Sequence, residues 1–106
     1  MKIYIAGPMT GLPDDNYPAF LWAEAELAEL GHEVVNPAKL NRPGEPWAKC
    51  MRVDIPAMLA CDALFVLPGW MGSRGAHLEV SIARDLAMPI FFAPHCPPPA
   101  EVEVSA

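Results

Sequence analysis

The stretch Asp62-Ala63-Leu64-Phe65-Val66-Leu67, closed by Pro68-Gly69, decides the fold of this chain. An uninterrupted apolar run of this length that ends at a turn signal is typical of a central strand buried on both faces. Strands of that kind belong to parallel sheets, which need helices to cover both faces. The sequence on either side should therefore alternate between helices and strands.

The flanking sequence alternates in this way. Short apolar runs that end at Gly, Pro or Asn predict further strands over 2–6, 32–35 and 89–93. Apolar residues at helical spacing predict helices over 17–30, over 47–61, and from Ser73 or Gly75 to Ala87. This order predicts a single α/β domain with a doubly wound parallel sheet of about four or five strands.

Two of the helices carry more detailed expectations. In 17–30, the apolar residues that recur at helical spacing are Phe20, Leu21, Ala23, Leu27, Ala28 and Leu30. In 47–61, Pro56 removes a hydrogen bond and crowds the preceding turn. We therefore expect this helix either to kink near Pro56 or to form as two pieces.

Composition excludes several classes of protein. The chain has 13 Asp and Glu residues against 7 Lys and Arg, and its net charge is −6. Nucleic-acid binding depends on clustered basic residues, so a small ligand or a protein partner fits better. No apolar run approaches the roughly 20 residues of a spanning helix, and the N-terminus begins directly with a strand pattern. We expect a cytoplasmic protein with no membrane segment.

The cysteines and the C-terminal segment predict little chemistry. Cys50, Cys61 and Cys96 are odd in number and lack metal-binding spacing, so we interpret them as reduced thiols. His32 and His77 likewise have no partner at metal spacing, and no metal site is expected. Residues 95–106 are rich in Pro and Glu, which predicts a tail that lies on the surface or is disordered.

Any ligand site should lie at one edge of the sheet. In doubly wound sheets, ligands bind beyond the carboxyl ends of the strands. The loops at 7–16, 36–46 and 68–76 all follow predicted strands, so they should meet there. The first of them begins Gly7-Pro8-Met9-Thr10-Gly11, which suits either a backbone that approaches a ligand closely or simply a tight turn.

The third loop carries the strongest candidates. Gly72, Ser73 and Gly75 can present amides and a hydroxyl at a helix N-terminus, where the helix dipole favours anions and polar oxygens. Glu79 follows about one turn into the helix. It either faces the same cleft or is simply stabilised by the dipole.

For three other side chains the sequence allows two alternative roles each. Asp54 is either an active carboxylate or an ordinary solvated charge, and the Tyr4 hydroxyl reaches either the cleft or solvent. The Trp70 ring either stacks on a flat base or packs. Packing alone explains Trp22 and Trp47, and Asp62 fits a structural connector between helix and strand.

Three motifs together resemble a known superfamily. They are Tyr4-Ile5-Ala6-Gly7-Pro8-Met9, Asp54 with Asp62-Ala63, and Ser73-x-Gly75-x-x-x-Glu79. The chain is similar to the nucleoside 2-deoxyribosyltransferase and deoxynucleotide N-hydrolase superfamily, most closely to its short bacterial and phage branch labelled a domain of unknown function. The resemblance runs from Lys2 to about Ala93, so residues 1–94 would form the domain and 95–106 the tail.

The resemblance implies a flavodoxin-like (Rossmann-like) fold, a homodimer or homotetramer, and no cofactor. Glu79 matches the nucleophile that attacks C1′ of a deoxyribose, Asp54 the second active-site carboxylate, and Tyr4 joins them as a catalytic candidate. The substrate would be a small nucleoside or nucleotide. The candidate substrate-binding residues are Gly7, Pro8, Met9, Gly11, Trp70, Ser73 and Gly75.

The resemblance leaves the substrate and the activity open. Ser73 stands where members that use nucleotides carry Ser and members that use nucleosides carry Asp, which favours a nucleoside 5′-monophosphate. Pro8 and Thr10, however, replace a Ser and an Arg of the nucleotide hydrolases, and Arg74 is a candidate for the lost charge. The alternatives are a non-catalytic nucleotide-binding module and an NAD glycohydrolase.

Overall fold

A four-stranded, all-parallel sheet organises the chain. The computed structural model describes residues 1–94, so the predicted tail and Cys96 lie outside the described residues. The strands are β1 (Lys2–Ala6), β2 (Glu33–Val35), β3 (Ala63–Val66) and β4 (Ile90–Phe92), in the spatial order β2-β1-β3-β4. This is the order of the first four strands of a flavodoxin-like sheet, so the predicted fold class is confirmed.

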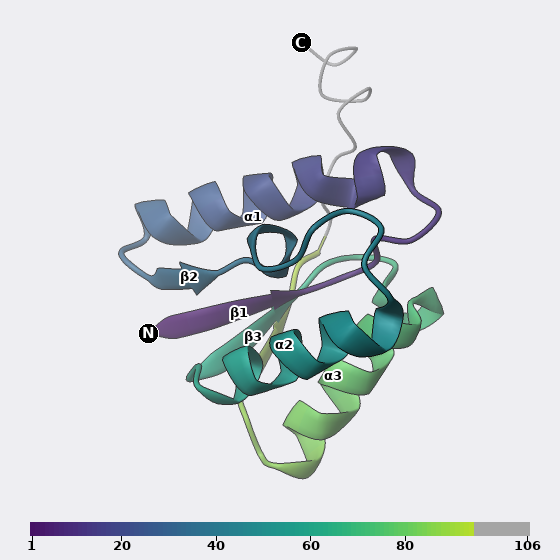
Figure 1. The fold of residues 1–106 in the computed structure, drawn as a ribbon. Coiled ribbons are helices and arrows are strands. Elements are labelled where there is room, and N and C mark those ends of the chain that lie inside the picture. The colour runs from purple at the N-terminus through teal and green to yellow at the C-terminus, as the bar shows by residue number, and fades with distance from the viewer. Residues whose placement is uncertain (95–106) are drawn as a thin grey trace, which may run out of the picture.

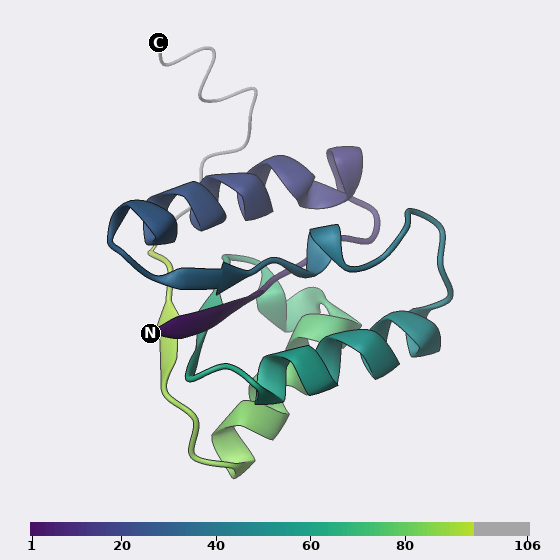
Figure 2. The ribbon, with the colours of Figure 1, turned by 60° about the vertical axis from the view of Figure 1, so that its left-hand side comes forward.

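Helices cover both faces of the sheet (Figures 1 and 2). The helix α1 (Tyr17–Glu29) lies on one face, and α2 (Trp47–Leu59) and α3 (Arg74–Asp85) lie on the other. Three short 3₁₀ helices, η1 (Pro13–Asn16), η2 (Pro37–Lys39) and η3 (Trp70–Gly72), occupy the three loops at the carboxyl ends of the strands. The crossover from β2 to β3 passes the face opposite α1, because β3 pairs on the other side of β1.

The central strand β1 divides the core into two halves. Ile3 and Ile5 pack with α1, whereas Tyr4 and Ala6 pack with α2 and α3. This alternation follows from the two-residue period of a strand. Tyr4, a large polar aromatic residue, is consequently fully buried beneath α3.

Only some of the apolar residues at helical spacing in the first helix are buried. Phe20, Ala23 and Leu27 are buried, but Leu21 and Leu30 are 50% and 74% exposed. Ala28 is also exposed. A helix that rests on one face of a sheet buries only one stripe, and apolar residues outside it stay in solvent.

Pro56 does not divide its helix. The helix α2 is continuous across this residue, so the alternative of two pieces is wrong. Pro56 is exposed, which leaves the carbonyl that loses its amide partner on the side that faces water.

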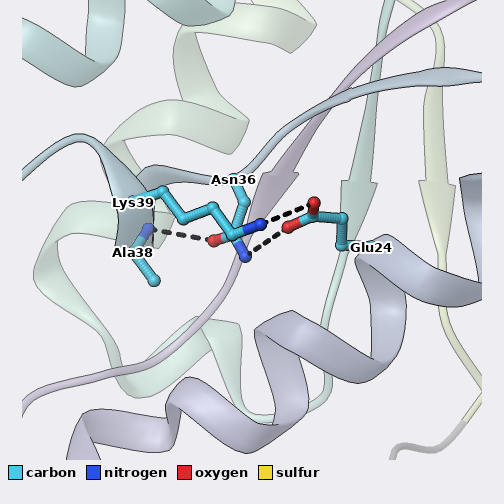
Figure 3. Close-up of polar contacts among 4 residues, drawn as sticks. All are labelled: Glu24, Asn36, Ala38 and Lys39. Carbon is cyan, nitrogen blue, oxygen red and sulfur yellow. Dashed lines mark hydrogen bonds and ion pairs between the residues drawn. The ribbon is translucent and has the colours of Figure 1, made fainter.

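The turn after β2 is fixed by a buried amide (Figure 3). Asn36 is 4% exposed. Its side chain accepts a hydrogen bond from the Ala38 amide at 2.9 Å and donates to Glu24 on α1 at 3.0 Å. Lys39 contacts the other carboxylate oxygen of Glu24 at 2.8 Å. These contacts lower the pKa of Glu24 and hold η2 against α1.

We expect Asn36→Ala to destabilise the fold by about 1–3 kcal/mol, because it leaves the Ala38 amide without its partner. Lys39→Ala is the comparison variant, since it removes only an exposed ion pair, whose contribution is about 1 kcal/mol or less. Urea unfolding followed by circular dichroism measures both. Equal losses for the two variants would show that Asn36 does not anchor the turn.

Candidate functional site

A cleft of about 1170 Å³ opens at the carboxyl ends of the strands. Its lining draws on all three loops that were predicted to meet there. Pro8 and Met9 come from the first loop, Pro37 and Glu45 from the second, and Ser73 from the third. The helices α2 and α3 form a further wall of the cleft. A cavity therefore lies at the edge of the sheet where a ligand site was predicted.

Three polar side chains meet in the wall of this cleft. Tyr4 lies on β1, Asp54 on α2 and Glu79 on α3, and all three line the cavity. The Tyr4 hydroxyl donates a hydrogen bond to Glu79 Oε2. Both carboxyl groups are buried, with Asp54 7% and Glu79 5% exposed. Three separate chain segments thus place two buried carboxyl groups and a buried phenol in the wall of one cleft.

Burial changes the protonation of these groups. The pKa of Glu79 is raised to about 8, because burial and the nearby Asp54 carboxylate together raise it more than the hydrogen bond from Tyr4 lowers it. Burial also raises the pKa of Asp54, and the hydrogen bond from Asn41 opposes this. The pKa of Tyr4 is raised by burial and then by the charge of Glu79, so the hydroxyl stays protonated and can donate. A site with two coupled carboxyl groups of shifted pKa is a functional candidate.

The raised pKa of Glu79 implies a loss of stability with rising pH. Glu79 begins to ionise in the unfolded chain near its ordinary pKa of 4.5, but in the folded chain only near 8. Below 4.5 both states hold the proton. Between the two values only the folded state does, so its stability relative to the unfolded state falls, by at most about 1.4 kcal/mol per pH unit.

Glu79→Gln should therefore stabilise the protein more at pH 8 than at pH 4.5. The amide oxygen of Gln still accepts the hydrogen bond from Tyr4 and never has to ionise in a buried position. Thermal unfolding of both proteins across this pH range measures the difference. Glu26→Gln, on the exposed part of α1, is the matched control. A difference between wild type and Glu79→Gln that does not change with pH would contradict the buried, protonated state of Glu79.

Asn41 is a further polar residue of the site, and it was not predicted from the sequence. Its side-chain amide donates to Asp54 Oδ1 at 2.8 Å and approaches the Pro37 carbonyl at 3.4 Å. The second loop therefore holds one oxygen of Asp54 in place. Asn in a loop gave no signal of its own, because the contact spans two separate elements.

Trp47 and Arg74 form a second polar feature of the cleft. The guanidinium carbon of Arg74 lies 3.6 Å from the centre of the Trp47 ring. Both residues line the cavity, although Trp47 was expected only to pack. A Cβ atom at Gly75 would lie 3.3 Å from Met51 Sδ and 3.4 Å from Trp47 Nε1. The glycine thus allows α2 to pack closely against the start of α3.

Comparison with known proteins places the chain in a family. A family model described as "Domain of unknown function (DUF4406)" matches residues 1–92. The chain belongs to the DUF4406 family. No curated protein matches the sequence. The matched region of this DUF4406 chain contains the whole cleft, including Tyr4, Asp54 and Glu79.

Two substrate-binding candidates lie elsewhere in the DUF4406 chain. Trp70 is absent from the lining of the cleft, and its ring packs at 5.7 Å from Phe92 and 5.9 Å from His77. Gly11 is also outside the lining, and its φ of +84° explains the glycine by backbone conformation. Trp70 follows the left-handed Gly69 and starts η3, which turns the ring toward β4.

Gly7, Pro8, Met9, Ser73 and Gly75 do line the cleft. Gly7 has a packing reason as well, because a Cβ atom there would lie 2.8 Å from Leu67 Cβ. Ser73 caps α3, where its Oγ accepts the Ala76 amide at 3.3 Å. The hydroxyl hydrogen of Ser73 remains available for a ligand.

The remaining predictions concern thiols, metals and membranes. Cys50 and Cys61 are free, and burial raises the pKa of each thiol. Asp62 accepts the Lys2 amide at 2.8 Å, as suits a connector between elements. The described part of the chain contains no cluster of three His, Cys, Asp or Glu side chains suited to a metal ion. Within residues 1–94, no helix is long and apolar enough to cross a membrane.

Proposed function

We propose that this DUF4406 protein cleaves the N-glycosidic bond of a deoxynucleoside or its 5′-monophosphate. The buried Tyr4–Glu79 pair, with Asp54 in the same cleft, is the observation that carries the proposal. Glycosidic cleavage uses two carboxyl groups, one as nucleophile and one as acid, around a transition state with positive charge on the sugar. A cavity of about 1170 Å³ is large enough for a nucleotide.

In the proposed reaction, the ionised Glu79 attacks C1′ as the bond between C1′ and the base nitrogen breaks. Asp54, in its acid form, gives its proton to that nitrogen, so the base leaves neutral. A water molecule or a second base then attacks C1′ and breaks the bond to Glu79, while Asp54 recovers a proton from the attacking group. Positive charge on the sugar favours the ionised form of Glu79 most strongly in the transition state.

Tyr4 is a positioning residue in this proposal. Its hydroxyl holds one oxygen of Glu79, which leaves the other oxygen to approach C1′. Asn41 has the same role toward Asp54.

The proposal predicts a specific effect of Tyr4 on the pH profile. The reactive form holds one proton on the Asp54–Glu79 pair, so kcat/KM should fall as the pH rises through about 8, where the pair loses it. Because the Tyr4 hydrogen bond lowers the pKa of Glu79, Tyr4→Phe should lower kcat/KM and move this fall to higher pH. Tyr17→Phe, which changes a phenol outside the cleft, is the control. An unchanged profile in Tyr4→Phe would contradict the positioning role.

A substrate panel tests the proposed function directly. The wild-type protein is incubated with deoxynucleosides, their 5′-monophosphates and NAD, and released bases are separated by chromatography. Release of free base supports the proposal, and a second run with an acceptor base separates hydrolysis from transfer. Release of nicotinamide alone would point to an NAD glycohydrolase. Binding of a nucleotide with no release of base from any substrate would point to a non-catalytic nucleotide-binding module.

A further inference from the structure

Three consecutive residues of η1 have left-handed backbone conformations. Asp14, Asp15 and Asn16 have φ angles of +52°, +51° and +61°. Such angles are costly for residues with a Cβ atom and usually occur singly, so a run of three is strained. Strain of this kind persists only where the surrounding structure holds it, and it is concentrated at ligand sites. The strained turn lies beside the cleft, because Leu12, Pro13 and Asn16 line the cavity.

The left-handed backbone prevents Asn16 from capping its helix. Asn16 is the N-cap residue of α1, a position where an Asn side chain usually accepts an amide of the first helical turn. That hydrogen bond goes with an extended backbone at the N-cap, whereas Asn16 is left-handed and makes no capping bond with its side chain. Its Nδ2 atom instead donates to the Pro8 carbonyl at 2.8 Å. The turn therefore directs this amide toward the first loop and away from α1.

The contact with Pro8 fixes the orientation of the Asn16 amide. A side-chain amide carries an acceptor oxygen and a donor nitrogen, and a free amide can present either one to a ligand. With Nδ2 on the Pro8 carbonyl, a flip of the amide would break this hydrogen bond and bring two oxygens together. Asn16 is partly buried and lines the cleft. Its Oδ1 atom is therefore an acceptor of fixed orientation in the cleft wall.

The surroundings of Asn16 suit a flat heterocycle. Met9, Leu12, Pro13 and Pro18 give this side of the cleft an apolar lining, whereas the carboxyl groups proposed to act on the sugar lie on α2 and α3. A small-molecule site typically buries apolar surface and reads identity through a few placed polar atoms. The faces of a base fit the apolar lining, and its polar edge would meet the Asn16 amide.

We propose that Asn16 Oδ1 accepts a hydrogen bond from the exocyclic amino group of the substrate base, so that the cleft prefers amino-bearing bases such as adenine and cytosine to their keto analogues. An amino group donates, whereas a keto oxygen at the same place would turn its lone pairs toward Oδ1. A site built to bond one polar group discriminates against an analogue that lacks it. This inference rests on the proposed function, because it places the base on the apolar side when the sugar lies at Glu79.

Pairs of substrates that differ only in this group test the inference. They are deoxyadenosine with deoxyinosine, and deoxycytidine with deoxyuridine. Asn16→Gly removes the amide, and glycine adopts the left-handed backbone without strain. In this variant the kcat/KM ratio of amino to keto substrate should fall about 10- to 100-fold for the pair that contains the best substrate. A ratio equal to that of the wild type would overturn the inference.

Two further variants separate loss of the acceptor from a loosened loop. Asn16→Asp also loses the donor to Pro8 but keeps an acceptor oxygen, so it should keep the preference for the amino substrate. Asp15→Gly makes the same replacement at an exposed left-handed neighbour outside the cleft lining, and its ratio should equal that of the wild type. Loss of the preference in Asn16→Asp or in Asp15→Gly would mean that the loop, and not the Oδ1 acceptor, selects the base.

A binding experiment separates this inference from the proposed function. Calorimetric titration of the four nucleosides into Glu79→Gln, and into the same variant with Asn16→Gly added, measures affinity without turnover. A preference for an amino nucleoside that disappears in the double variant supports the acceptor even if the wild type releases no base, in which case the proposed function fails alone. Equal affinities within both pairs, or a preference that survives in the double variant, overturn the inference even if the wild type is an active glycosidase. Absence of binding by all four nucleosides would overturn it as well.

Discussion

Replacing Glu79 by Gln is expected to reduce base release by about 1000-fold or more. Gln has nearly the same shape and still accepts the hydrogen bond from Tyr4, but its amide cannot form the covalent bond to C1′. Loss of a nucleophile removes the covalent route itself, so the fall should appear in kcat and not only in KM. Steady-state kinetics on the best substrate of the panel, with free base read by chromatography, measures it.

Two comparisons make this result specific. Glu26→Gln, on the exposed part of α1, makes the same chemical change far from the cleft and should keep full activity. Mass spectrometry of the wild type after rapid quenching should show a sugar adduct on the peptide that contains Glu79. Activity of Glu79→Gln within about tenfold of wild type would remove Glu79 from the role of nucleophile. A fold lost in the variant would be visible as a lower melting temperature, whereas burial of Glu79 predicts a higher one.

The order of elements was predictable because it depends on local patterns. The run over 62–67 marked a central strand, and the strand observed is Ala63–Val66. Helix boundaries were off by one or two residues, as for α3, which was expected from Ser73 or Gly75 to Ala87 and spans Arg74–Asp85. Which apolar side chains of a helix face the sheet was harder to predict. Leu21 and Leu30 fit the spacing, but only the docking of α1 decides which stripe is covered.

The residues of the site likewise divide into those that local sequence motifs predict and those whose placement depends on the fold. Tyr4, Asp54 and Glu79 came from motifs, and the fold brings β1, α2 and α3 together along one cleft. Trp47 was expected only to pack but lines the cleft, whereas Trp70, for which both stacking on a base and packing were considered, packs on β4. Each tryptophan begins a helix that follows a loop: Trp47 begins α2 and Trp70 begins η3. The direction of the ring at such a position depends on the backbone turn before it, such as the one at the left-handed Gly69. The spacing of apolar residues along the sequence does not reveal that turn.

Asp54→Asn is expected to lower kcat/KM for ordinary deoxynucleosides or their monophosphates by about 100- to 10,000-fold, the usual range for loss of a general acid. Asn keeps the shape of Asp54 and can still face Asn41, but it has no proton to give to the leaving base. Asp85→Asn, at the exposed end of α3, is the matched control. Kinetics on the same substrate panel measures the loss.

A substrate that needs no proton separates acid catalysis from mere positioning. An N7-methylated deoxyguanosine derivative carries a positive charge on its base, so the base leaves neutral without help from Asp54. The loss caused by Asp54→Asn should shrink to about tenfold or less on this substrate, because only the acid step is bypassed. Removing the charge of Asp54 also lowers the pKa of Glu79, so the variant should reach its full rate on this substrate at a lower pH than about 8. An equal loss on both substrates would mean that Asp54 orients the sugar or Glu79 and donates no proton, and the acid would then have to be sought elsewhere in the cleft.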